Sequence, residues 1–222
     1  MKLIWSPETA TKAYIETVKS CEKIKESGVA ELLAAMAGGW DAKLIVEAWS
    51  YGSPVATSIG LAVAARQTCG RHVCIVLDER TRQEYIKAMR SSTAPPPQLP
   101  EVVIGEAEAA MEALGGGVDF LVVDCGRRDF GRVLRSAKVS NRGAVFACKN
   151  AWQRNVSGFQ WQWALEKGTR VVRSVFLPVG NGLDIAHIGS SSGGGAMVSR
   201  KGPSRWITHV DQRSGEEHVF RE

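Results

Sequence analysis

The alternation of short apolar runs with stretches of helical periodicity constrains the fold of this chain more than any other feature of its sequence. Each run is about as long as a buried strand, and most are followed by a segment in which apolar residues recur at helical spacing. The predicted strands are 44–48, 72–77, 102–104, 120–123 and 144–148. Strands that alternate with helices form a parallel sheet covered by helices on both faces. The sequence therefore predicts an α/β fold, a Rossmann-like sandwich.

Helix-start and helix-stop signals place the helices around these strands. Ser6 is a candidate N-cap, and the helix that it opens is expected to run to about Glu26. A second helix should end at Gly38-Gly39, so that two helices precede the first strand. Ser53-Pro54 is interpreted as the cap of the next helix, and Thr81-Arg82-Gln83-Glu84 as a capping box that opens another.

The last part of the chain changes character. Residues 170–177 and 183–188 are expected to form two strands, and the short connection between them makes the pair antiparallel. We expect one domain over 1–189, including the two N-terminal helices, followed by a flexible Ser/Gly-rich segment at 190–203. The remainder, 204–222, is expected to form a terminal β-hairpin packed on the same domain.

Composition excludes several classes of protein. The chain has 222 residues, 44% hydrophobic and 23% charged, which is typical of a globular protein. No apolar run approaches the roughly 18 residues that cross a bilayer, so we expect no membrane contact and a location in the cytoplasm, with the nucleus as an alternative. The five cysteines include no C-x-x-C pair, which argues against zinc and a disulfide framework.

Several stretches resemble one enzyme family. The sequences "GVAELLAAMAGGWDAKLIVEA", "VVIGEA", "VDFLVVDC" and "LPVGNGLDIAHI" resemble the first-strand, third-strand, fourth-strand and final-hairpin regions of cation-dependent O-methyltransferases that act on catechols and caffeoyl-CoA. The whole chain, from "MKLIWSPETATKAYIETVK" to "SGEEHVFRE", resembles a plant family of unknown function that is classed as methyltransferase-like. The resemblance implies a class I methyltransferase sandwich with an antiparallel last strand, and S-adenosylmethionine or S-adenosylhomocysteine as the cofactor.

The resemblance also implies a set of cofactor-binding residues. Asp78, directly after the second strand, matches the carboxylate that accepts hydrogen bonds from the ribose hydroxyls. Glu106 and Ala107 match the segment that contacts the adenine edge. The predicted cofactor-binding residues are Glu47, Ala48, Trp49, Ser50, Gly52, Asp78, Glu79, Glu106, Ala107 and Asp124.

Trp49 departs from this pattern, because it stands where the family has the first glycine of the cofactor loop. A glycine there avoids a collision with the cofactor. Two interpretations stay open: the ring closes the pocket or packs beneath the N-terminal helices, or the loop is rebuilt around Ser50, Gly52 and Ser53. We favour the rebuilt, working loop.

Three residues are candidates for catalysis: Asp124, Lys149 and Asn150. In the cation-dependent enzymes these positions hold a metal ion, but the third ligand is a carboxylate where this chain has Lys149, and an ammonium repels a cation. We therefore expect no metal. Lys149 is interpreted either as a replacement for the metal's charge, which binds an anion, or as a structural partner of Asp124. Arg127 holds the position of a family lysine and is a poor general base.

Two functions follow as alternatives. The first is a metal-independent methyltransferase that acts on a small, aromatic or anionic acceptor, and the second is an inactive methyltransferase-like binding or scaffold protein. Trp152, Trp161 and Trp163 supply aromatic surface for a flat acceptor or for a homodimer, although we expect at least two of them in the core. The basic residues Arg132, Arg135, Lys138 and Arg142 are interpreted as a solvated face and not as a nucleic-acid site; none of the four histidines is a candidate.

Overall fold

The chain folds around a seven-stranded sheet with the strand order β3-β2-β1-β4-β5-β7-β6. The computed structural model describes residues 5–22, 24, 28–92, 99–153 and 159–190, and the backbone alone of 206–210 and 217–221. The strands are β1 Leu44–Ala48, β2 Arg71–Val76, β3 Glu101–Ile104, β4 Phe120–Asp124, β5 Ala144–Lys149, β6 Val171–Leu177 and β7 Leu183–Ile188. β1 to β5 are parallel, whereas β7 is antiparallel to both β5 and β6. The predicted α/β fold is confirmed.

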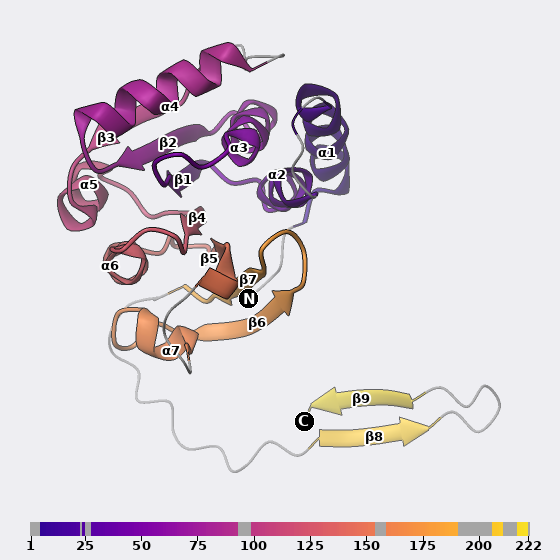
Figure 1. The fold of residues 1–222 in the computed structure, drawn as a ribbon. Coiled ribbons are helices and arrows are strands. Elements are labelled where there is room, and N and C mark those ends of the chain that lie inside the picture. The colour runs from indigo at the N-terminus through magenta and orange to yellow at the C-terminus, as the bar shows by residue number, and fades with distance from the viewer. Residues whose placement is uncertain are drawn as a thin grey trace. The chain divides into compact units, whose positions relative to one another are not determined.

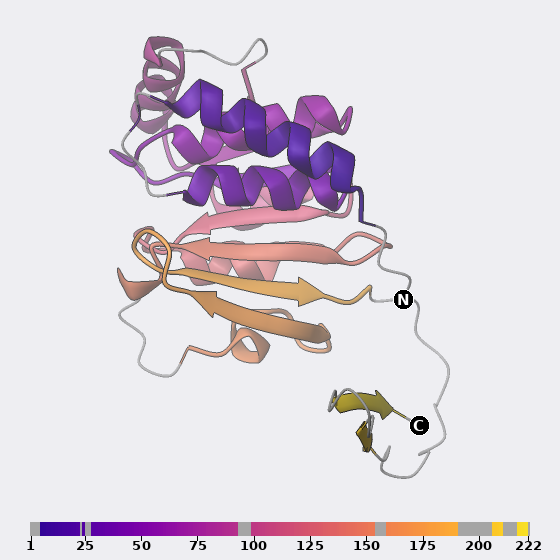
Figure 2. The ribbon, with the colours of Figure 1, turned by 90° about the vertical axis from the view of Figure 1, so that its right-hand side faces the viewer.

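Helices cover both faces of the sheet (Figure 1). They are α1 Pro7–Cys21, α2 Val29–Gly39, α3 Ala56–Gln67, α4 Glu79–Ser91, α5 Ala107–Ala113, α6 Phe130–Ser136 and α7 Trp161–Ala164, with a 3-10 turn η1 at Ala151–Gln153. One core cluster joins α5, α6 and α7 to one face of the sheet, and two others join α1 to α4 to the opposite face. α1 and α2 pack side by side (Figure 2). Gly60 lets α3 approach α2, because a Cβ there would lie 2.8 Å from the Ala30 carbonyl oxygen.

The ends of three helices test the predicted caps. Ser6 caps α1 as expected, by accepting a hydrogen bond from the Thr9 amide, but α1 ends at Cys21, before the predicted Glu26. Ser53-Pro54 is not the cap of α3: the N-cap residue is Val55, which makes no side-chain hydrogen bond.

The predicted capping box at Thr81–Glu84 is also wrong. α4 begins earlier, at Glu79, and its N-cap is Asp78. The amide and the hydroxyl of Thr81 both donate to Asp78 Oδ1, each at 2.7 Å. Thr81 is therefore a donor inside the first turn, and Asp78, already singled out as a strand-end acid, also starts the helix.

The chain divides into two compact units, residues 1–191 and 192–222. In the second unit, β8 Trp206–Val210 and β9 Glu217–Arg221 pair antiparallel, so the predicted terminal hairpin exists. The Ser/Gly-rich segment 190–203 lies almost entirely outside the described residues, and the packing of the hairpin on the first unit stays a prediction. Within the described ranges, no helix combines the length and the apolar character that a membrane crossing requires.

Candidate functional site

A cavity of about 770 Å³ opens at the carboxyl ends of β1, β4 and β5. The strand order reverses between β1 and β4, and an open α/β sheet binds its ligands at such a switch point. The described residues that line the cavity are Val29, Ser50, Tyr51, Gly52, Ser53, Pro54, Thr57, Asp124, Gly126, Lys149, Asn150, Gln153, Gly180, Asn181 and Gly182. The cavity therefore combines the loop after β1, the ends of β4 and β5, and the β6–β7 turn.

The loop after β1 begins with a buried residue, Trp49, and the residues that follow line the cavity. The Trp49 ring is 1% exposed and packs edge-on against Tyr85 of α4, at 5.3 Å between ring centroids. It belongs to a core cluster that includes Cys21 of α1 and Ala30 of α2, and it does not line the cavity. The ring thus packs beneath the helices. The five residues that follow it, Ser50 to Pro54, line the cavity, and Gly52 lies in the left-handed region at φ 76°.

Asp124 is the polar centre of the cavity wall. Ser53 Oγ donates to its Oδ2 at 2.8 Å, while the Gly126 amide and Asn150 Nδ2 donate to its Oδ1 at 2.8 and 2.9 Å. The residue is only 1% exposed. These bonds tie the loops after β1, β4 and β5 together, and they use much of the acceptor capacity of a carboxylate.

Lys149 ends β5 beside Asp124. Its Nζ lies 3.8 Å from Asp124 Oδ2, and its side chain is 7% exposed. That distance is an ion-pair contact and exceeds hydrogen-bond length. The structural pairing that the sequence left open is therefore present in a loose form, and Lys149 also lines the cavity.

Asn150 links β5 to the β6–β7 turn. Its backbone is left-handed at φ 55°, and its Oδ1 accepts a hydrogen bond from Asn181 Nδ2 at 3.3 Å. The amides of Ala151 and Trp152 donate to the carbonyl oxygens of Gly182 and Asn181. The turn thereby forms one wall of the cavity, a role that the "PVGNG" sequence did not suggest beyond a strand connection.

Arg127 is a structural clamp. Its guanidinium forms a bidentate pair with Asp129, at 2.8 and 2.7 Å, and Nη1 donates to the carbonyl oxygens of Trp49 and Ile75 at 2.9 and 3.0 Å. Arg127 is 4% exposed. All these contacts are to protein groups, so the residue holds the ends of β1 and β2 in register with the loop after β4.

Glu47 lies inside the sheet and not in the cavity. It is 0% exposed, and its Oε2 is 3.6 Å from Nε2 of the buried His72. Among the described residues, neither carboxylate oxygen of Glu47 and neither ring nitrogen of His72 has a hydrogen-bond partner. Both side chains are buried between β1 and β2, and the contact of Glu47 with a cofactor stays a prediction.

The remaining predicted cofactor residues lie outside the cavity lining. Asp78 is exposed, and the hydroxyl and amide of Thr81 hold its pKa below the ordinary value. Glu79 pairs with Arg82 at 3.0 Å and Glu106 with Arg132 at 3.0 Å. The other two, Ala48 and Ala107, are 0% exposed. The structure thus gathers Ser50, Gly52 and Asp124 of the predicted cofactor set with Lys149 and Asn150. Ser53, expected in the rebuilt loop, joins them, and the structure adds Thr57, Gln153 and Asn181, which the sequence did not single out as cavity residues.

Two tryptophans are exposed, which corrects the expectation of at least two in the core. Trp161 is 4% exposed, but Trp152 is 60% and Trp163 is 70% exposed. Trp152 lies next to Phe176, with ring centroids 6.2 Å apart, and a Cβ at Gly182 would lie 3.2 Å from Trp152. An exposed aromatic pair therefore borders the cavity.

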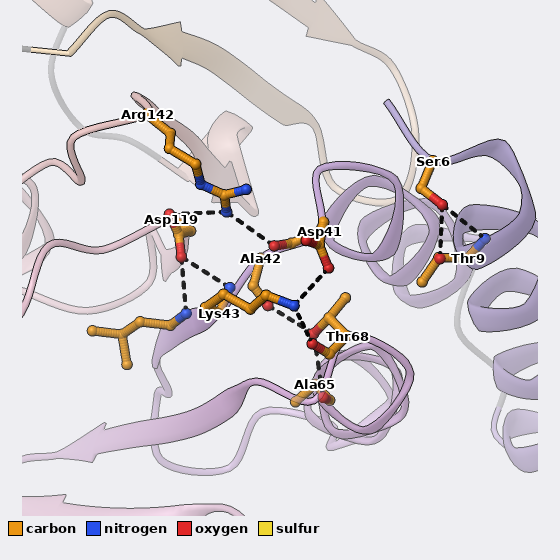
Figure 3. Close-up of polar contacts among 10 residues, drawn as sticks. Ser6, Thr9, Asp41, Ala42, Lys43, Ala65, Thr68, Asp119 and Arg142 are labelled. Carbon is orange, nitrogen blue, oxygen red and sulfur yellow. Dashed lines mark hydrogen bonds and ion pairs between the residues drawn. The ribbon is translucent and has the colours of Figure 1, made fainter. Parts of the chain in front are cut away.

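Arg142, one of the predicted basic residues, forms an ion pair with Asp119 near the start of β4. Arg142 lies 3.4 Å from Asp119 and donates to the Asp41 carbonyl oxygen (Figure 3). Asp119 Oδ2 also accepts from the Lys43 and Leu44 amides, at the amino end of the sheet.

Among the described residues, no group of three or more His, Cys, Asp and Glu could hold a metal ion.

Comparisons with known proteins agree with this fold. Residues 1–222 match the model of a family described as "Protein of unknown function (DUF1442)". No curated protein sequence matches the chain. The identities to the solved structures described next are low, so they show a shared fold and nothing finer.

Three solved structures share the fold over most of both chains. An SAH-bound methyltransferase of Podospora anserina, PaMTH1, has a TM-score of 0.53 at 14% identity, over 85% of this chain and 90% of that one. An O-methyltransferase from Bacillus cereus in complex with SAH has a TM-score of 0.53 at 15% identity, over 84% and 93%. TomG of Streptomyces achromogenes, an O-methyltransferase involved in tomaymycin synthesis and solved with SAM, has a TM-score of 0.53 at 19% identity, over 85% and 92%.

Proposed function

We propose that this chain, which belongs to the DUF1442 family of proteins of unknown function, is an S-adenosylmethionine-dependent methyltransferase that acts on a small acceptor without a divalent metal. The cavity at the β1–β4 switch point carries the proposal. Support comes from solved structures of the same fold whose described ligands are SAM or SAH. When bound, the cofactor supplies a methyl group on a positively charged sulfur.

The N-terminus of α3 is suited to the carboxylate of the cofactor's methionine part. α3 has 12 residues, and its N-cap makes no side-chain hydrogen bond. Amides at such a helix end attract anions. Thr57 in its first turn lines the cavity, is 1% exposed, and its hydroxyl has no hydrogen-bond partner among the described residues. A buried hydroxyl without a partner is costly, so a cofactor carboxylate at this helix end would gain a donor that the described residues do not use.

The loops after β1 and β2 are suited to the adenosine part. Arg80 stacks on the exposed Tyr51 ring at 4.9 Å and donates to its hydroxyl at 3.1 Å, which joins the two loops. Asp78 precedes Arg80 and keeps acceptor capacity for ribose hydroxyls. Glu106, after β3, is the proposed adenine contact, whereas Ala107 is 0% exposed and packs in the core behind it.

The donor set does not fit a divalent metal. Mg²⁺ and Ca²⁺ require several oxygen ligands, of which anionic carboxylates are the strongest. Asp124 is bonded to Ser53, Gly126 and Asn150, and the Lys149 ammonium lies 3.8 Å away from it. We therefore propose that acceleration comes mainly from positioning the acceptor in the cavity.

Calorimetry with S-adenosylmethionine and S-adenosylhomocysteine tests the proposal. Both ligands are expected to bind, and Thr57→Val, which removes one hydroxyl at constant shape, should weaken them roughly tenfold through loss of a hydrogen bond to a charged group. Ser58→Ala is the matched control, because that buried hydroxyl belongs to the same turn but does not line the cavity. If neither ligand produces heat or a thermal shift, the chain is a methyltransferase-like binding protein instead.

A further inference from the structure

Lys149 presents unsatisfied hydrogen-bond donors to the cavity. Its side chain is 7% exposed, and an ammonium has three N–H donors. Within the described residues, its one ion-pair partner is Asp124 at 3.8 Å, which is too far for a hydrogen bond. A largely buried cation in this state is stabilised by an anionic ligand that enters the cavity in place of water.

The described cavity lining offers no histidine, and no carboxylate free of other hydrogen bonds, that could take a proton from an acceptor. Its ionisable residues are Tyr51, Asp124 and Lys149. Asp124 already accepts bonds from Ser53 and from two further donors, and the Tyr51 hydroxyl accepts from Arg80. A neutral hydroxyl acceptor would have to lose its proton during methyl transfer, and general-base help requires a group within hydrogen-bond reach. An acceptor that is already ionised avoids this requirement.

We propose that the acceptor is a carboxylic acid in its carboxylate form, held by Lys149, and that the product is its methyl ester. The inference rests on the proposed methyltransferase function. A carboxylate oxygen forms a bond to the methyl carbon, the carbon–sulfur bond breaks, and its electron pair stays on sulfur. No proton is released, because a carboxylate is the dominant form at neutral pH.

The mouth of the cavity indicates a flat, apolar body for this acid. Trp152 and Phe176 form an exposed aromatic pair beside Gly182, which lines the cavity. Aromatic side chains offer stacking surface for planar groups. Cinnamate and benzoate are therefore suitable probes, and their amides are neutral molecules of nearly the same shape.

The first test measures binding without turnover. Calorimetry of cinnamate and cinnamamide, with and without S-adenosylhomocysteine, should show at least tenfold tighter binding of cinnamate to the native protein. Lys149→Met should remove this preference and leave the affinity for S-adenosylhomocysteine within about twofold. Lys138→Met, at the amino end of the sheet, is the control and should change neither value. Equal binding of acid and amide, or an unchanged preference in Lys149→Met with a native unfolding midpoint, overturns the proposal.

The second test uses caffeic acid, which carries a carboxylate and a catechol on one molecule. With S-adenosylmethionine, the expected product is the methyl ester, at a rate nearly constant between pH 6 and 9, since the carboxylate stays ionised across that range. A methyl ether as the product overturns the carboxylate acceptor while the methyltransferase function stands. If neither S-adenosylmethionine nor S-adenosylhomocysteine binds, the proposed methyltransferase function fails. A preference for cinnamate that depends on Lys149 would in that case support an anion-binding site at Lys149 without methyl transfer.

Discussion

The Trp49 side chain and the residues that follow it have separate roles within one loop. The ring packs in the core against Tyr85, and the polar end of the loop lines the cavity. A glycine at position 49 would therefore create a void in the core and not a wider cofactor site. The ring thus takes the place beneath the helices that was one of the two open interpretations, and a working cofactor loop around Ser50, Gly52 and Ser53 stays a prediction.

Trp49→Gly is expected to destabilise the protein without strengthening cofactor binding. Removal of a large buried ring costs about 3 to 5 kcal/mol of unfolding free energy. Urea unfolding measures this loss, and calorimetry with S-adenosylmethionine should give equal or weaker affinity at a temperature where the variant is folded. Trp152→Gly is the matched control, because that ring is 60% exposed and its loss should cost far less. Tighter binding by Trp49→Gly would mean that the ring fills the site after all.

Asp78 caps a helix and is also the candidate ribose-binding acid. It caps α4 through Thr81, and it stands at the end of β2, where nucleotide folds place a ribose-binding acid. The Thr81 donors lower its pKa, so its contribution to stability is fully present above about pH 3.9, the ordinary aspartate value, and is lost as pH falls through the lowered value.

Asp78→Asn separates these two roles. Asparagine caps helices as well as aspartate does, so the unfolding midpoint at pH 7 should stay close to that of the native protein. The affinity for S-adenosylhomocysteine should fall roughly tenfold, because a charged acceptor is replaced by a neutral one. Asp78→Ala should lose both the cap and the affinity. An unchanged affinity in Asp78→Asn moves the ribose site elsewhere.

The sequence predicted the strands well because their signal is local. Each apolar run that was assigned to the sheet is a strand, and the antiparallel last pair follows from the short connection between 177 and 183. Helix N-caps were harder to predict. Ser53 fits the capping pattern, but its hydroxyl donates a hydrogen bond to Asp124, 71 positions away in the chain. Cavity residues such as Thr57 and Asn181 carry no distinctive motif, since tertiary packing alone brings them to the carboxyl edge.

The core contains ionisable groups that do not line the cavity. Cys74 is fully buried, opposite Glu47 in the β1–β2 register. Burial, followed by the charge of Glu47, raises the pKa of the Cys74 thiol well above its ordinary value. Burial also raises the pKa of Tyr85, with Cys74 and Glu47 as further causes. The native state therefore keeps protons that the unfolded chain releases in alkaline solution.

This difference predicts alkaline destabilisation that depends on Cys74. Because the folded pKa is the higher one, the stabilising contribution of the thiol is complete below about pH 8.5, the ordinary cysteine value, and it is lost as pH rises from there towards the folded pKa. One such group lowers the unfolding free energy by up to about 1.4 kcal/mol for each pH unit in that window. Tyr85 adds to the loss above about pH 10.

Urea unfolding between pH 7 and pH 10, with a reductant present, measures the slope of stability against pH. Cys74→Ala should make the slope of unfolding free energy against pH shallower above pH 8.5, by up to about 1.4 kcal/mol per pH unit. This change in slope does not depend on how much stability the variant loses at pH 7. Cys69→Ala, at an exposed thiol, is the matched control and should keep the native slope. Parallel curves for the two variants would show that the Cys74 thiol ionises alike in the folded and unfolded chain. The buried Glu47–Cys74 neighbourhood would then have to be open to water, and the core beneath α3 and α4 looser than its packing indicates.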